Sequence, residues 1–178
     1  VLGSYTFDHY RTTLKAEQKP SLKTVNVMVA NQAAARKAYA PLAKVAEGVF
    51  FTRDLVTQPA NIIYPKTLAQ EARKLSKLGV KVEVLGRARM EQLEMGALLG
   101  VAQGSVREPQ MVVMRYDGGK RGQAPLAFVG KGVTFDTGGI SIKPAQGMED
   151  MKWDMGGSAV VIGLMRALAG RKAKCNVI

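Results

Sequence analysis

Residues 126–144, LAFVGKGVTFDTGGISIKP, decide the fold, because a short apolar strand here runs directly into a glycine-rich loop. A second stretch, MKWDMGG at residues 151–157, ends in two glycines where an apolar helical pattern begins. Strand, loop and helix in this order are typical of an α/β protein, in which ligands bind beyond the carboxyl ends of the strands. We therefore expect a site where the strand 126–129 ends.

Two lysines and two aspartates stand among the glycines and apolar side chains of these stretches: Lys131, Asp136, Lys143 and Asp154. An unpaired buried charge costs several kcal/mol, so these charges must neutralise one another or hold an ion. The pattern predicts half of a carboxylate metal site. Asp154 has a second interpretation, because a carboxylate before a helix can cap its free N–H groups without any metal. Spacing alone leaves both interpretations of Asp154 open.

The composition is that of a globular protein, with 47% hydrophobic and 22% charged residues among 178. No apolar run reaches 18 residues, so no membrane span is predicted. The single cysteine excludes an internal disulfide and fits a reducing compartment. With only one histidine, His9, a Cys/His zinc site is excluded and a Ser-His-Asp triad is disfavoured. A metal would need carboxylates, lysine amine, carbonyls and water, which suits Mn²⁺, Mg²⁺ or carboxylate-held Zn²⁺.

The net charge of +12 and the pI near 10 raise an alternative function, that of a nucleic-acid-binding protein. The basic residues are scattered along the chain, however, and no RNA-binding aromatic motif or zinc finger accompanies them. Solvated helix faces account for most of these charges. A DNA-binding regulator built on the same fold is therefore the second hypothesis.

The rest of the chain alternates strand and helix patterns. We expect strands at 22–30, 80–85, 110–116, 126–129 and 174–178, and helices at 31–57, 65–78, 88–95 and 156–168. Asn31 is placed to cap the first helix, Pro41 to bend it, Pro65 to begin the second helix and Gly79 to end it. This alternation predicts an α/β fold with a mostly parallel sheet flanked by helices.

The two stretches together resemble the first half of the active site of the leucyl aminopeptidases, the di-metal cytosol aminopeptidase family. The steps of five, seven and eleven residues between the four charged positions match the family's motif without a gap. The likeness extends upstream to GSYTFDHY at 3–10 and TQPANIIYP at 57–65, so it covers the whole chain. Its specificity lies almost entirely in residues 129–157.

The resemblance implies a role for each of these positions in an aminopeptidase that removes apolar, leucine-like residues from peptides. Asp136 would bridge two divalent ions, Mn²⁺ or Zn²⁺, while Lys131 and Asp154 would bind the more loosely held ion. Lys143 would be the catalytic ammonium that polarises the scissile carbonyl. Met151 would line the pocket for the first side chain, and all five residues would contact the substrate.

The resemblance also implies a domain organisation and an assembly. Residues 1–30 would end a smaller N-terminal α/β domain, 31–60 would form a linker helix, and 61–178 would be the first part of the catalytic domain. The expected protein is a cytoplasmic homo-hexamer. The family's Asn-Thr-Asp-Ala-Glu-Gly-Arg motif, which supplies further ligands, is absent from the 178 residues. We therefore expect this piece alone to be inactive, and a metal-free, inactive relative is a third possibility.

Overall fold

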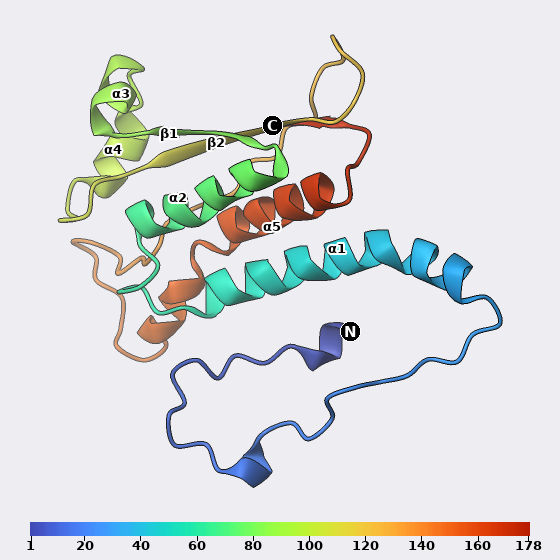
Figure 1. Cartoon of the computed structure of the whole chain (residues 1–178). Coiled ribbons are helices and arrows are strands. Elements are labelled where there is room, and N and C mark those ends of the chain that lie inside the picture. The colour runs from blue at the N-terminus through green and yellow to red at the C-terminus, as the bar shows by residue number, and fades with distance from the viewer.

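The computed structural model describes residues 1–178, in which helices cover one face of a small sheet. Figure 1 shows α2 (Pro65–Arg73) and α5 (Gly156–Gly170) beneath the sheet, and α1 (Gln32–Thr57) beyond them. The remaining elements are β1 (Lys81–Leu85), α3 (Arg87–Gln92), α4 (Gly96–Ala102), β2 (Met111–Asp117) and β3 (Asn176–Val177), with short 3-10 helices η1 (Leu2–Ser4), η2 (Ala16–Gln18), η3 (Lys74–Leu78) and η4 (Met148–Trp153). The predicted α/β class is confirmed.

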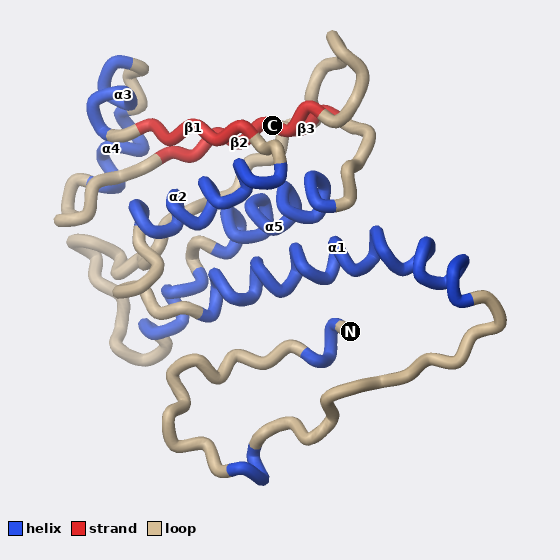
Figure 2. Tube along the Cα trace, in the orientation of Figure 1, coloured by secondary structure: helices blue, strands red, loops and turns tan.

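The strand pairing corrects the expectation of a mostly parallel sheet. The strand order is β1-β2-β3, and both ladders are antiparallel, with Leu85 opposite Met111 in one and Tyr116 opposite Val177 in the other. The chain between β1 and β2 forms α3 and α4 at the end of the strands in Figure 2 and does not cross the sheet face, so the second strand returns antiparallel. Only the segment 126–128 runs parallel to its neighbour, β3.

Local sequence chemistry sets the helix boundaries as predicted. The Asn31 side chain accepts a hydrogen bond of 2.9 Å from the Ala34 amide and so caps α1. Pro65 is the first residue of α2, where its missing N–H costs no hydrogen bond. Gly79 ends the following 3-10 turn with φ of 85°, a conformation that favours glycine. Pro41 is accommodated within α1.

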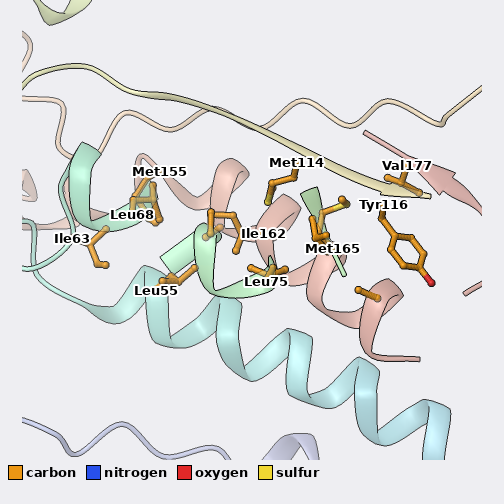
Figure 3. Close-up of a cluster of buried hydrophobic side chains, with 14 residues drawn as sticks. Leu55, Ile63, Leu68, Leu75, Met114, Tyr116, Met155, Ile162, Met165 and Val177 are labelled. Carbon is orange, nitrogen blue, oxygen red and sulfur yellow. The ribbon is translucent and has the colours of Figure 1, made fainter. Parts of the chain in front are cut away.

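The core lies between the sheet and the helices (Figure 3). Leu55, Met114, Met155 and Met165 belong to one cluster of buried apolar residues drawn from α1, β2, α5 and the residue before α5. Such burial contributes about 25 cal/mol for each Å² of apolar surface removed from water. The core therefore fixes α5, which follows the predicted site, against both α1 and the sheet.

Residues 22–30 do not form the predicted strand. Their backbone joins no ladder, and the side chains of Val27 and Met28 are 76% and 93% exposed. Alternating sequence specifies a strand only where another strand offers a pairing edge, and none of β1 to β3 pairs with this segment. The residues before it do contact the helical layer, since the Tyr5 hydroxyl donates a hydrogen bond of 2.9 Å to Asp54 on α1. No helix of the chain is long and apolar enough to cross a membrane.

Candidate metal centre

The two stretches identified in the sequence meet at the start of α5. The Ser158 amide donates a hydrogen bond of 2.8 Å to the carbonyl of Lys131, which joins the strand end to the first turn of the helix. A side chain at Gly130 would place its Cβ 2.5 Å from the Gly157 carbonyl oxygen, and a Cβ at Gly157 would lie 3.0 Å from the Lys131 nitrogen. Only glycine allows the two backbones to approach this closely. Ser158 was not singled out in the sequence, and its place directly after the glycine pair is the one signal for it.

Lys131 and Asp154 form the first ion pair of the site, with 2.6 Å between Nζ and Oδ1. The Asp154 side chain is 19% exposed, while that of Lys131 is 58% exposed. The second carboxylate oxygen of Asp154, Oδ2, is buried and accepts no hydrogen bond. A buried acceptor without a partner costs about 1–3 kcal/mol, and more when it is charged, so this oxygen is free to bind a donor or a cation.

The capping interpretation of Asp154 is wrong. The N-cap of α5 is Met155, and no side chain accepts a hydrogen bond from that helix start. The Asp154 residue instead ends the 3-10 helix η4, and its carboxylate bonds to Lys131. The carboxylate is therefore directed at the predicted site and not at the helix amides.

Lys143 and Asp136 form the second ion pair, with 2.9 Å between Nζ and Oδ2. The Lys143 ammonium and the Gly138 amide, which donates a hydrogen bond of 2.9 Å to Oδ1, hold the pKa of Asp136 below its ordinary value. A tight turn brings the pair together, because the Lys143 amide donates to the Thr137 carbonyl at 2.9 Å. Gly138 adopts φ of 91° in this turn, where a Cβ would lie 2.3 Å from the Ser141 carbonyl oxygen.

Met151 lies beside Lys143, with 3.1 Å between the Met151 sulfur and Nζ. The same Nζ lies 3.1 Å from the Asp136 carbonyl oxygen, so three contacts orient the ammonium. The positive charge of Lys131 also contributes to the lowered pKa of Asp136, which places the two ion pairs within electrostatic reach of each other.

The chain brings the five predicted residues into two groups, Lys131 with Asp154 and Lys143 with Asp136 and Met151. No three histidine, cysteine, aspartate or glutamate side chains lie together so that they alone could hold a metal ion. Two carboxylates, a lysine amine and backbone carbonyls could contribute to a divalent-cation site. They provide fewer oxygen ligands than hard cations take. Trp153 lies next to Asp154 with 51% of its surface exposed, so it does not pack into the core.

The family model and the relatives that match this chain belong to one family. Residues 50–178 match the family model described as cytosol aminopeptidase family, catalytic domain. The "Probable cytosol aminopeptidase" of Caulobacter vibrioides is 60% identical over 178 residues, and that of Bradyrhizobium sp. is 58% identical over 177. Each alignment covers 99% of this chain and 36% of the relative. The chain thus spans about a third of the length of these relatives.

Solved structures lead to the same family. The bottromycin maturation enzyme BotP in complex with Mn matches with a TM-score of 0.81 and 33% identity, over 99% of this chain and 36% of that one. The cytosol aminopeptidase from Coxiella burnetii matches with a TM-score of 0.79 and 29% identity, over 99% and 35%. Sequence and structure therefore agree that this chain belongs to the cytosol aminopeptidase family and contains part of its catalytic domain.

Proposed function

We propose that the complete protein is a metal-dependent aminopeptidase that removes apolar, leucine-like residues from the N-termini of peptides. The observation that carries this proposal is the two Lys–Asp ion pairs, one beside the start of α5 and one in the turn 136–143, with a buried oxygen of Asp154 left without a partner. These contacts pair, two by two, the four positions whose spacing matches the family's motif. The 178 residues would supply the first half of the active site.

The donors present would supply part of a site for divalent ions such as Mn²⁺ or Zn²⁺. Asp136 would bridge two ions, and Asp154 and Lys131 would bind one of them, with the free Oδ2 of Asp154 available to a cation. Each lysine neutralises one of the two carboxylates. Bound divalent ions would supply the activation of a water molecule, by lowering its pKa.

Each lysine would then have a different task. Lys131 would bind a cation through the lone pair of its neutral amine, in place of its ion pair with Asp154. Lys143 must remain an ammonium, since it would donate to the oxygen of the scissile carbonyl as negative charge develops there. Met151, which already contacts Nζ of Lys143, would pack against the first side chain of the peptide.

Other features of the complete protein are proposed from the family and its named relatives. The name of the relatives, probable cytosol aminopeptidase, supports a cytosolic location. A homo-hexamer, peptide substrates and a domain organisation of 1–30, 31–60 and 61–178 follow from the resemblance. The geometry gives no specific support to the DNA-binding regulator or to the metal-free relative.

The decisive experiment compares two variants of the complete protein. Lys143→Met removes one donor to the developing charge, so kcat for a leucine amide substrate should fall by about 100- to 1,000-fold while the metal content stays normal. Asp136→Asn should lower both the metal content and the turnover. Lys152→Met is the matched control, because Lys152 lies in the same stretch but contacts Trp153. Near-normal turnover of Lys143→Met would refute the assignment.

A further inference from the structure

A basic pocket lies between α5 and η3, the short helix that follows α2. The pocket is a cavity of about 230 Å³ at the place where η3 packs against α5. Three cationic and three apolar side chains line it: Lys74, Lys77 and Arg166, with Phe51, Leu75 and Leu78. No acidic side chain belongs to the lining. The cavity therefore combines positive charge with apolar surface.

Arg166 is the cation that α5 contributes to the basic pocket. Its guanidinium carbon lies 4.8 Å from the centre of the Phe51 ring, so the side chain is held against α1. The Nε atom of Arg166 is buried and has no hydrogen-bond partner. None of the seven ion pairs of the chain involves Arg166. A buried charged donor without a partner is costly, so this guanidinium is a positioned cation that lacks an acceptor.

The two lysines of the pocket lie on one side of η3. A 3-10 helix has three residues per turn, so Lys74 and Lys77 lie one above the other. Cations near the end of a helix also interact favourably with its free carbonyl groups, which is the ordinary explanation for such lysines. That explanation does not extend to Arg166, because the last turn of α5 contains no basic residue. The convergence of cations from two helices therefore needs another explanation.

The carboxylates of the surrounding helices do not balance this charge. Neither η3 nor α5 contains an acidic residue. Those of α1 and α2 each bond to another residue outside α5: Glu47 to Lys44, Asp54 to Tyr5 and Glu71 to Lys74. Lys77 and Arg166 therefore have no counter-ion.

We propose that the basic pocket binds the phosphate group of a small molecule. The planar guanidinium of Arg166 presents paired N–H groups that match two oxygens of a phosphate, and the lysine ammonium groups are donors for the remaining oxygens. The side chains of Phe51 and Leu78 provide apolar surface for the organic part of a phosphate ester. Free phosphate and a phosphate ester share the same recognition chemistry.

The basic pocket is separate from the candidate metal centre. Arg166 follows Gly156, the first residue of α5, by ten residues, which is about 15 Å along a helix that rises 1.5 Å per residue. None of the five predicted site residues lines the pocket. The proposal therefore does not depend on the proposed catalytic activity.

Calorimetric titration of the complete, metal-free protein with phenyl phosphate and with inorganic phosphate tests the proposal. We expect Arg166→Met and Lys77→Met each to weaken binding at least about tenfold, equivalent to 1.4 kcal/mol. Lys77→Met keeps the test valid even where Arg166→Met does not fold, because Lys77 is exposed and forms no ion pair. Tighter binding of phenyl phosphate would identify an ester as the ligand, and equal binding would identify free phosphate. No binding of either, or equal binding of acetate, would overturn the proposal.

Two matched variants control for the overall positive charge of the chain. Lys66→Met and Arg121→Met remove the same charges from exposed residues outside the pocket, so phosphate binding should not change. Equal weakening in all four variants would overturn the proposal in favour of nonspecific attraction.

Lysine acetylation, followed by mass spectrometry, locates the bound phosphate. Phosphate should slow acetylation of Lys77 and leave that of Lys66 unchanged. Protection of Lys143 in place of Lys77 would put the phosphate at the candidate metal centre and overturn the proposal.

Discussion

The contact between α1 and α5 and the loop that carries the candidate site are stabilised in opposite ways. The helices meet at two glycines, where a Cβ on Gly163 would lie 2.0 Å from the Thr52 hydroxyl and one on Gly48 would lie 2.6 Å from the Gly163 carbonyl oxygen. The loop buries little, since Ile140 and Ile142 are 107% and 73% exposed. Glycine turns and two ion pairs hold the loop.

This difference separates the fold from the chemistry. Adding or removing an atom in a tightly packed interface lowers the free energy of unfolding. Ion pairs that are partly exposed contribute little, so their charges can exchange partners without unfolding the protein. The proposed site, which would replace lysine–carboxylate pairs with metal–carboxylate bonds, is suited to such a loop. The helix pair supplies the rigid support beneath it.

The largest effect on stability should come from Gly163→Leu. The new side chain has no space between α1 and α5, so the helices must separate, and we expect a loss of about 3 kcal/mol or more in the free energy of unfolding. Urea denaturation measures it. Gly100→Ala in α4 is the matched control, because a Cβ there meets nothing within 4 Å, and it should stabilise the helix by up to about 1 kcal/mol. Equal stability of the two variants would contradict the close contact between α1 and α5 at Gly163.

A smaller effect on stability is expected from Asp154→Asn. The pair with Lys131 is partly exposed and one carboxylate oxygen has no partner, so the free energy of unfolding should change by no more than about 1 kcal/mol. Binding of Mn²⁺ to the complete protein, followed by calorimetry, should nevertheless weaken at least about tenfold, since a negatively charged ligand is lost. A large loss of stability with unchanged metal binding would contradict this expectation, because it would show that the loop stabilises the fold and does not hold the metal.

The two regions also differ in how far the sequence predicts them. Helix boundaries follow from local chemistry, so Asn31, Pro65 and Gly79 were interpreted correctly. Strand pairing depends on residues distant in sequence, and the alternating segment 22–30 therefore suggested a strand that has no partner here. The close approach of Gly48 and Gly163 has no local signal either, because glycine within a helical pattern normally lowers the expectation of a helix.

For the site, spacing and family resemblance predict the residues but not their contacts. The capping and metal interpretations of Asp154 predict different directions for its side chain, and that direction depends on Lys131, 23 residues away. The Met151 contact with Lys143 likewise depends on how η4 folds back against the turn at residues 137–143. Only the three-dimensional arrangement distinguishes these cases.

The smallest effect is the response of the two regions to acid. Lys143 and the Gly138 amide lower the pKa of Asp136 from its ordinary value near 3.8, and Arg115 and Lys81 do the same for Asp117 on β2. A carboxylate whose folded pKa is lowered stabilises the fold above its unfolded pKa, and this contribution disappears as the pH falls from about 3.8 through the folded value.

We therefore expect Asp136→Asn and Asp117→Asn each to lose less stability than the unmodified protein when the pH falls from about 5 to about 2. Urea titration of the metal-free protein measures the free energy of unfolding at each pH. Lys143→Met separates the regions: it removes the largest cause of the Asp136 shift and should leave the contribution of Asp117 intact, because Asp117 depends on Arg115 and Lys81. If Lys143→Met and Asp117→Asn together altered the acid response no more than either alone, the two carboxylates would not act independently. The loop could then not be treated as separate from the sheet.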